Sequence, residues 1–447
     1  MPPRLLDRPA TPTAVALRRL DALVSPYVGI VRSVEEVLGE PADIRLHNLC
    51  CETGHLPPLV GHGGKQIGAG SGRTRAAARA AAIAEAVERY AACASDEVAA
   101  AVDCAATLGD DAVAPARFAL HSRGQYAQAG FPYAPFDDST AVAWVEGFRL
   151  PDGDAALLPA QLAYLSWSLR PGEARVASAT SSGLACHVSA EEATLSGLLE
   201  VLERDAFMLT WKARLSWPRL TWSGSHPLAQ FDRRYVRPTG LRVGAIDLSP
   251  VWEVPCVLGV ARSDVPGEAP LGVGAAAAAT VAHAAEKALD EAVRVRTWAT
   301  ALRAADPAAA ALPPPDEIRD FEEHIHHYAY EENLAACAFL DGSEQRRDAA
   351  SVPSLEGDTP LQRIEALCDR LHRRGLSAYA VDVTSADVRE AGLRVVKVLV
   401  PELCALDVEH AARYLGGTRL YEEPFRLGFY DAPLTERDLN PDPHPFP

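Results

Sequence analysis

The sequence predicts an α+β fold in which layers of helix and sheet are repeated along the chain. Three long segments carry apolar residues at helical spacing, and the shorter apolar runs between them are bounded by Pro, Gly and Asp. The last third passes from a helix to two strands, which is typical of a layered α+β architecture. No long spacer divides the 447 residues, so we expect one large domain or two closely packed halves.

The first part of the chain predicts one long helix and a set of short strands. Residues 1–12 are rich in proline and are expected to be flexible, whereas residues 13–40 mix helical spacing with a short β-branched run. A glycine-rich stretch that we expect to be flexible precedes Thr74, which is placed to cap a helix over about 75–94. From about 110 to 180, short apolar stretches separated by turn residues predict strands and turns.

The second part predicts further long helices and strands. Ser189 and Glu192 form a capping-box pattern at the start of a helix that should extend to about residue 213. The remaining elements are expected in this order: strands over 242–249 and 254–263, a helix over 279–305, an exposed loop over 306–316, a helix over 360–374, and strands over 378–383 and 393–400.

Composition excludes several functional classes. The formal net charge of -17 disfavours binding to nucleic-acid phosphates or to anionic lipid. Nine cysteines without a Cys-x-x-Cys pair suit a reducing compartment better than a disulfide framework. The first residues do not resemble a signal peptide, and no run of 18 uncharged apolar residues follows, so we expect a cytoplasmic protein.

One acidic signature occurs twice, as Glu85-Ala-Val-Glu88-Arg89 and as Glu200-Val-Leu-Glu203-Arg204. Residues three apart lie on one face of a helix, so each copy places two carboxylates side by side. Like charges repel there unless a cation compensates, and a hard divalent ion such as Mg²⁺ prefers carboxylate and phosphate oxygens. The repeat therefore predicts a site for Mg²⁺ and a nucleoside triphosphate.

A second interpretation of this signature is a solvated helix face, because Glu and Arg are good helix formers. Ile83, Val87, Leu199 and Leu202 place apolar side chains next to the acids and favour a packed interface. On the residues alone both interpretations stay open.

Three segments resemble the motifs of the YcaO family. Residues 68–90 (GAGSGRTRAAARAAAIAEAVERY) resemble its first motif, in which a Gly-Lys-Gly turn precedes Ser-x-x-x-Glu-x-x-Glu-Arg. Residues 181–207 resemble the second motif and residues 284–296 (AAEKALDEAVRVR) the third. The resemblance extends from about residue 20 to the C-terminus, and it implies a YcaO-type fold enclosing a site for ATP and Mg²⁺.

The resemblance also implies roles for individual residues. The positions matched to magnesium ligands are Glu85, Glu88, Glu200 and Glu203. The positions matched to nucleotide contacts are Ser71, Arg89, Ser182, Arg204, Lys287 and Glu291.

The sequence departs from the family pattern at four positions. Ser71 stands where the turn has lysine, Ala81 replaces the motif serine, Lys287 replaces arginine and Arg294 replaces glutamine. Lys287 keeps its charge but lacks the bidentate fork of arginine. We hypothesise that Lys65 or Arg73 supplies the charge missing at residue 71.

The chain ends with proline at every second position, from Pro441 to Pro447. Such a peptide is stiff and extended, and by composition it fits a disordered tail or a ligand for a proline-binding module. The YcaO members that form azolines end in a similar tail. The resemblance therefore implies that Pro447 is catalytic, acting through its carboxylate as a general base or positioning one.

The implied function is an ATP-dependent cyclodehydratase. It would convert Cys, Ser or Thr residues of a ribosomally made precursor peptide to thiazolines or oxazolines by phosphorylating the backbone amide oxygen. The alternatives are thioamide or amidine formation at the same site and a catalytically weak scaffold subunit. Expected domains are a YcaO-type domain over 13–439 and a tail over 440–447.

The resemblance also implies a set of partners. They are a precursor peptide with its leader, a separate leader-binding protein related to ubiquitin-activating (E1-like) enzymes, a flavin dehydrogenase for azole formation, and a second copy of the chain in a homodimer. Neither nucleic acid nor a membrane is expected.

Two histidine-containing segments carry weaker signals. Cys50 and Cys51 with His47 and His55 match no standard zinc spacing, and buried thiols are more common. Three histidines in FEEHIHHYAY (321–330) are expected on a surface segment. Neither the dinucleotide-binding glycine fingerprint nor the phosphate-binding Gly-x-x-x-x-Gly-Lys loop is present.

Overall fold

The computed structural model describes residues 5–37, 43–54, 66–93, 98, 101–305 and 314–446. The chain divides into two compact units. The first comprises Met1–Leu38, Leu46–Val201 and Glu356–Leu403, and the second comprises Gly39–Arg45, Leu202–Leu355 and Cys404–Pro447. Helix α7 (Ala190–Lys212) carries the chain from the first unit into the second.

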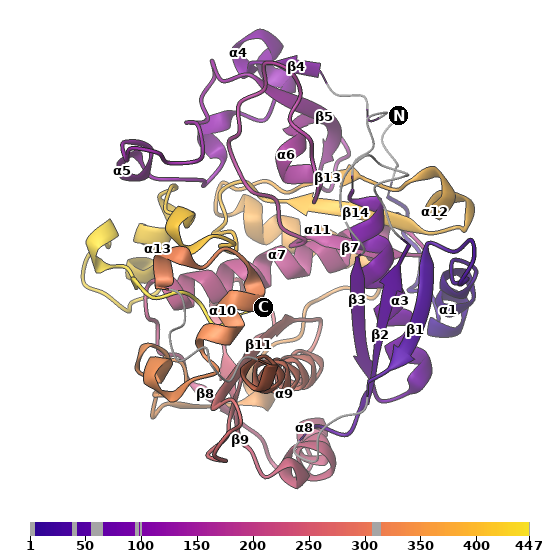
Figure 1. Cartoon of the computed structure of the whole chain (residues 1–447), viewed down its shortest axis with the longest axis vertical. Coiled ribbons are helices and arrows are strands. Elements are labelled where there is room, and N and C mark those ends of the chain that lie inside the picture. The colour runs from indigo at the N-terminus through magenta and orange to yellow at the C-terminus, as the bar shows by residue number, and fades with distance from the viewer. Residues whose placement is uncertain are drawn as a thin grey trace. The chain divides into compact units, whose positions relative to one another are not determined.

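The first unit contains a three-stranded antiparallel sheet covered by a helix. Its strands are β1 (Val31–Glu36), β2 (His47–Thr53) and β3 (Ile67–Gly72), in that order. Helix α3 (Arg75–Ala91) packs along β3 and β2, and α1 (Thr13–Asp21) packs against α3 (Figure 1).

The glycine stretch expected to be flexible is a strand where it is described, over 67–72. A Cβ at Gly68 would lie 2.3 Å from the carbonyl oxygen of Ala82, and one at Gly70 would lie 2.3 Å from that of Ala78. Only residues without a side chain allow α3 to approach β3 so closely. The glycines therefore serve close packing of a helix, and the expectation of flexibility was wrong for this part.

The first unit also contains a larger sheet, in the order β4-β5-β13-β14-β7 with β6 paired to β5. The strands expected over 378–383 and 393–400 are confirmed as β13 and β14, and β5 lies in the region of 110–180 where strands and turns were expected. The bounds in this part of the unit are β4 (Ala101–Asp103), α4 (Ala105–Leu108), α5 (Arg123–Tyr126), β5 (Val142–Arg149), β6 (Ala155–Pro159), α6 (Ala160–Ala163), β7 (Leu184–His187), α11 (Pro360–His372), β13 (Tyr379–Asp382), α12 (Ala386–Glu390) and β14 (Arg394–Leu399).

The second unit repeats the pattern of an antiparallel hairpin followed by a long helix. Its sheet has the order β11-β10-β9-β8-β12, and α9 (Val281–Ala305) packs on β11 and β10 (Figure 1). A Cβ at Gly272 would lie 2.2 Å from the carbonyl oxygen of Ala292, so glycine again permits close contact of strand and helix. This repetition confirms the expected layered α+β fold.

The remaining elements of the second unit are shorter. They are β8 (Arg219–Thr221), α8 (Pro227–Phe231), β9 (Arg242–Asp247), β10 (Cys256–Arg262), β11 (Leu271–Ala277), α10 (Phe321–His327), β12 (Arg346–Asp348) and α13 (Arg419–Arg426). Most of the loop expected over 306–316 lies outside the described residues. Among the described helices, none combines the length and the apolar character needed to cross a membrane.

Both predicted helix caps form. The side chain of Thr74 accepts a hydrogen bond from the Ala77 N–H at 3.2 Å, and that of Ser189 accepts one from the Glu192 N–H at 3.2 Å. In the N-terminal segment, the backbone N–H groups of Leu6 and Thr11 donate to the acids of the first turn of α7. The start of the chain is thus tied to α7 at two points.

Candidate functional site

Three carboxylates gather in the first unit, two from α3 and one from α7. Glu85 and Glu88 lie one turn apart on α3, and Glu200 lies on the part of α7 that belongs to this unit. Burial raises the pKa of Glu88 well above its usual range, and the nearby charges of Glu85 and Glu200 raise it further. Such a cluster is stabilised by a bound cation.

Backbone N–H groups orient each of these acids. The N–H of Cys186, on β7, donates to Glu88 Oε1 at 2.7 Å, and the N–H of Ala69, on β3, donates to Glu85 Oε2 at 2.7 Å. The N–H of Gly183 approaches Glu200 Oε2 at 3.4 Å. These contacts fix the orientation of the three carboxylates, including that of Glu88, whose pKa is raised.

Arg89 joins the acidic cluster to the first sheet. Its Nη2 donates to Glu85 Oε1 at 2.7 Å, and its Nη1 donates to the carbonyl oxygen of Ile67 at 2.8 Å. About a third of each side chain of this pair stays exposed, 34% for Arg89 and 32% for Glu85. The ion pair therefore borders solvent, where a ligand can reach it.

A buried lysine holds the turn from Thr180 to Gly183, which precedes β7. Lys397 on β14 is only 3% exposed, and its Nζ donates to the carbonyl oxygens of Thr180 at 2.6 Å and of Ser182 at 2.7 Å. Burial lowers the pKa of Lys397 to about 8, and the charge of Glu200 opposes that shift. The turn is thus fixed by a cation beside the acidic cluster.

Gly183 makes this turn possible. Its φ of 84° is in the left-handed region, and a Cβ there would lie 2.4 Å from the carbonyl oxygen of Val398. Any other residue would move the Gly183 N–H away from Glu200. Ser182, the predicted nucleotide contact, is half-buried at the centre of this turn.

The second unit holds the other predicted acids and arginine. The N–H of Ala277, the last residue of β11, donates to Glu203 Oε2 at 2.9 Å, and Arg204 pairs with Glu203 Oε1 at 2.5 Å. The N–H of Ala275 donates to Glu291 Oε2 at 2.8 Å. The pair Ala275–Glu291 has the same sequence separation as Ala69–Glu85, 16 residues, so the repeat extends to the way its acids are held.

The positions that depart from the family pattern lie on the same elements. Ser71 is half-buried on β3 opposite Asn48, and Lys287 is exposed on α9. Arg73 is exposed between β3 and α3, whereas Lys65 lies outside the described residues. The buried cation near the acids is Lys397, which was not among the hypothesised substitutes for the missing lysine. It is the only lysine of its strand and has apolar neighbours, so no local pattern indicates its role.

The arrangement of the acids suits a metal ion whose remaining ligands are oxygens of a bound nucleotide. Within the described ranges, no group of three or more His, Cys, Asp or Glu side chains is arranged to hold a metal ion by itself. Mg²⁺ commonly takes one or two protein carboxylates and completes its shell with phosphate oxygens and water. The oxygen donors and the excess of negative charge around Glu88 fit Mg²⁺ bound together with a nucleotide.

The C-terminal tail is packed into the second unit as far as it is described. Asn440, His444 and Phe446 are 0%, 2% and 0% exposed. The ring of Phe446 lies 4.6 Å from that of Phe207 on α7, and the Arg204 guanidinium lies over the Phe446 ring at 4.5 Å. The tail is therefore an ordered part of the fold next to Glu203. Pro447, the predicted catalytic residue, lies outside the described residues.

The histidine segment expected on the surface is partly buried instead. His324 on α10 is 0% exposed, and its ring stacks on that of His444 with the centroids 4.0 Å apart. The local sequence does not indicate that His324 is buried, because its partners, the carbonyl oxygens of Val408 and His444, are distant in the sequence.

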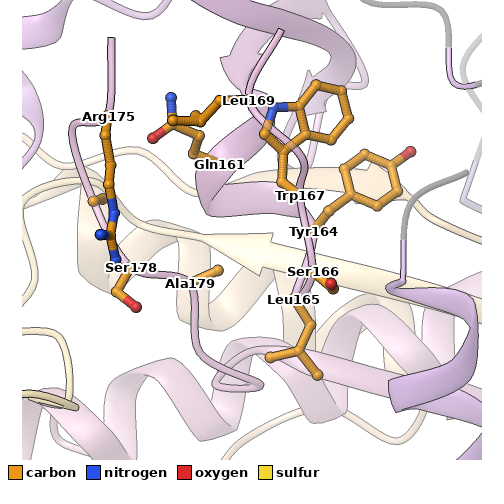
Figure 2. Close-up of a pocket in the computed structure, with 10 residues that line it drawn as sticks. Gln161, Tyr164, Leu165, Ser166, Trp167, Leu169, Arg175, Ser178 and Ala179 are labelled. Carbon is orange, nitrogen blue, oxygen red and sulfur yellow. The ribbon is translucent and has the colours of Figure 1, made fainter. Parts of the chain in front are cut away.

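A pocket of about 250 Å³ opens in the first unit beside the Thr180–Gly183 turn. Figure 2 shows Arg175 on one side of it and Trp167 and Tyr164 on the other. Glu173 fixes this region, because it accepts hydrogen bonds from the Trp167 indole N–H at 3.0 Å and from Gln161 at 2.7 Å. Its floor includes Ser178 and Ala179, which lead directly into the turn.

The comparisons with known proteins agree with this geometry. Residues 69–404 match the family model described as YcaO cyclodehydratase, ATP- and Mg²⁺-binding. A solved heterocyclase in complex with substrate and cofactor is 26% identical, with a TM-score of 0.81 over 100% of this chain and 59% of its own. The chain thus spans about three fifths of that heterocyclase.

Two further proteins are similar over most of both chains. The YcaO structure from Methanopyrus kandleri bound with AMPPCP and Mg²⁺ is 21% identical, with a TM-score of 0.64 over 90% of this chain and 94% of its own. An uncharacterized protein of Methanothermobacter thermautotrophicus is 26% identical over 370 residues, which are 80% of this chain and 87% of that protein.

Proposed function

The chain belongs to the YcaO family, and from this premise we propose that it is an ATP-dependent cyclodehydratase of ribosomally made peptides. It converts Cys, Ser or Thr residues of a precursor peptide to thiazolines or oxazolines. The observation that carries the proposal is the acidic cluster around Glu88, whose raised pKa and hydrogen-bonded oxygens suit Mg²⁺ and ATP. The similarity to a heterocyclase supports the type of reaction.

In this proposal the repeated acids hold Mg²⁺. The proposed ligands are Glu85, Glu88, Glu200 and Glu203, and the arginines that follow the paired acids, Arg89 and Arg204, contact phosphate. The other nucleotide contacts are Ser71, Ser182, Lys287 and Glu291. The hydrogen bond from Ala275 to Glu291 and the lysine-held turn at Ser182 support these assignments, because both fix the polar group in place before a ligand binds.

The reaction begins when a side-chain thiol or hydroxyl of the peptide attacks the preceding carbonyl. ATP supplies the γ-phosphoryl group that turns the former amide oxygen into a leaving group, so that one water is lost per ring. The chain's own groups orient the phosphates and offset the negative charge that develops during transfer. Pro447 provides or positions the base that accepts the proton.

The tail favours azoline formation over the alternatives that use sulfide or an amine as nucleophile. The burial of residues 443–446 supports an active-site role, since a disordered tail or a ligand for another domain would stay exposed. The pocket between Arg175 and Trp167 is proposed to receive a side chain of the peptide next to the modified residue.

We also propose that a separate leader-binding protein, related to ubiquitin-activating enzymes, presents the precursor. The chain spans 59% of the similar heterocyclase. We propose that a flavin dehydrogenase then oxidises the azolines to azoles. We also propose that the chain forms a homodimer.

Mass spectrometry of a precursor peptide tests this function. The peptide is incubated with the enzyme, the leader-binding partner, ATP and Mg²⁺, and we expect loss of one water per ring. Glu88→Gln keeps an acceptor for the Cys186 N–H but removes the charge, so it should abolish turnover, whereas Glu146→Gln on the exposed side of β5 should not. Exchange of oxygen for sulfur would favour thioamide formation, and an unchanged peptide would favour a scaffold.

A further inference from the structure

The described tail, residues 440–446, is held mainly through its backbone carbonyl oxygens. The Trp211 indole N–H donates to Asp442 O at 3.0 Å, and the Tyr328 hydroxyl donates to Pro443 O at 2.5 Å. Since alternate prolines remove most N–H groups, carbonyl oxygens are the groups that such a tail offers for recognition. The second unit therefore holds the tail through side-chain hydrogen-bond donors that point at its carbonyl oxygens.

His324 makes the most unusual of these contacts. Its Nδ1 lies 3.0 Å from the carbonyl oxygen of His444, in the tail, and its Nε2 lies 3.1 Å from that of Val408, in the body of the unit. The ring is fully buried and stacks on the His444 ring with an interplanar angle of 7°. One side chain on α10 thus joins the tail to the segment before it.

The surroundings of His444 fix its protonation. The Phe446 N–H donates to Nδ1 of His444 at 3.3 Å, and Nε2 faces the carbonyl oxygen of Asp407 at 2.8 Å. Nδ1 must therefore accept and Nε2 must donate, which is the neutral Nε2–H tautomer. The body residue Asp407 is itself locked by Lys212, whose Nζ lies 2.9 Å from its Oδ1.

His324 faces only carbonyl oxygens, so any hydrogen bond that its ring makes with them is one that it donates. A neutral ring has one N–H and can hold either His444 or Val408, and only a ring protonated on both nitrogens holds both. The contact to the tail therefore depends on a proton at Nδ1. The contact with the tail, made by Nδ1, can therefore be tested separately from the contact with Val408, made by Nε2.

The position of the tail also affects the neighbourhood of Glu203. Two residues beyond His444, the Phe446 ring lies 4.6 Å from the ring of Phe207 and 4.5 Å from the Arg204 guanidinium. Arg204 in turn pairs with Glu203. A displaced tail would leave Arg204 without its aromatic contact.

We infer that His324 is a positioning residue for the reaction, because its Nδ1–H holds the His444 carbonyl and so places the C-terminal end of the tail. The inference rests on the proposed function only in assigning turnover to the tail. The docking of the tail itself can be measured without any activity.

Two substitutions separate the two nitrogens of His324. The amide nitrogen of Asn replaces Nδ1 of histidine and can still donate to His444 O, whereas that of Gln replaces Nε2 and can donate only to Val408 O. We therefore expect H324N to retain the docked tail and H324Q to release it. H326N, on the same helix and next to Tyr330 instead of the tail, is the matched control.

Two measurements on the full chain read the outcome. Hydrogen–deuterium exchange of the C-terminal peptide should rise in H324Q and stay near the wild-type level in H324N and H326N. In the presence of the leader-binding partner, kcat for ring formation should fall about tenfold or more in H324Q, the effect of leaving one buried carbonyl unpaired. The KM for ATP should change little.

The outcomes distinguish this inference from the proposed function. If H324Q leaves exchange of the tail unchanged, or if H324N loosens it as much as H324Q does, the inference is wrong. If exchange follows the expected order but no variant, wild type included, forms rings, the role of His324 in docking the tail stands while the proposed function fails.

Discussion

At the scale of single residues, the candidate site combines acids that the sequence indicated with a lysine that it did not. Glu85, Glu88 and Glu200 attracted attention because their spacing repeats, whereas Lys397 sits alone in a strand whose neighbours are apolar. Its partners, Thr180 and Ser182, are 217 and 215 residues away in the sequence. No local pattern can reveal such a contact.

We predict that Lys397→Met weakens both ATP binding and the fold. Methionine fills the space of the lysine stem but leaves the carbonyl oxygens of Thr180 and Ser182 without their donor, and a buried unpaired group costs about 1–3 kcal/mol. The turn that holds the Gly183 N–H against Glu200 should then lose its geometry. Calorimetry should show at least about tenfold weaker ATP binding, and urea unfolding should show a lower midpoint.

Lys287→Met provides the contrast. Lys287 is exposed on α9, so its replacement should weaken ATP binding while leaving the urea midpoint near that of the wild type. Wild-type ATP affinity in Lys397→Met would contradict the role assigned to the buried lysine.

At the scale of secondary-structure elements, the sequence predicted the long helices well and the glycine strand poorly. The helices α3, α7 and α9 follow from apolar spacing and from the caps at Thr74 and Ser189, which act locally. The strand β3 has no β-branched side chain apart from Ile67, so its composition suggested a loop. The reason for its glycines is the approach of α3, which is a tertiary contact.

We predict that Gly70→Ala destabilises the first unit. The new Cβ would lie 2.3 Å from the carbonyl oxygen of Ala78 and from the N atom of Ala82, so the strand and α3 must move apart. Overpacking of this kind costs about 1–3 kcal/mol. Because α3 carries Glu85 and Glu88, ATP binding measured by calorimetry should fall together with the urea midpoint.

Gly54→Ala is the matched control in the same unit. Its nearest contact would be the Arg32 side chain at 3.8 Å, an ordinary van der Waals distance. Equal urea midpoints for the two variants would show that α3 and β3 tolerate a wider spacing.

The segment from Tyr164 to Ala179 is another element whose role is local. Trp167 lines the pocket, and its indole N–H donates to Glu173. This hydrogen bond fixes the ring in place, so its apolar surface is formed before a peptide binds. We predict that Trp167→Ala raises KM for the precursor peptide by about tenfold or more, the scale of losing a buried aromatic contact, with little change in KM for ATP. Steady-state kinetics with the leader-binding partner measure both constants. A larger effect on KM for ATP would place the pocket in the nucleotide site.

At the scale of the whole molecule, the sequence predicted a repeated α+β fold, but the tail's setting depends on the folded chain. Proline alternation indicated a stiff peptide, and the resemblance implied an active-site role. A cluster of three histidines forms only when α10 and the segment before α13 meet the tail. It consists of His324 on α10, His410 before α13 and His444 in the tail itself. Their burial introduces a dependence of stability on pH that composition alone does not reveal.

We predict that the protein loses stability as the pH falls from about 6.5 toward 4. Burial lowers the pKa of His410 from 6.5 to about 4 and also lowers the pKa values of His324 and His444. In this window the unfolded chain binds protons that the folded chain does not, so the free energy of unfolding decreases as the pH falls. A shift of the size seen at His410 corresponds to about 3 kcal/mol.

His410→Gln tests this origin, because glutamine can still donate from the position of Nε2 to the carbonyl oxygen of Pro441 but does not titrate. Urea unfolding at several pH values between 7 and 4 should give a shallower decline for His410→Gln than for the wild type. His372→Gln, an exposed position on α11, should follow the wild-type curve. Parallel wild-type and His410→Gln curves would mean that the buried imidazole beside the tail is not what makes the fold sensitive to acid. Glu88 could not replace it as the cause, because a carboxyl group with a raised pKa favours the folded state as the pH falls.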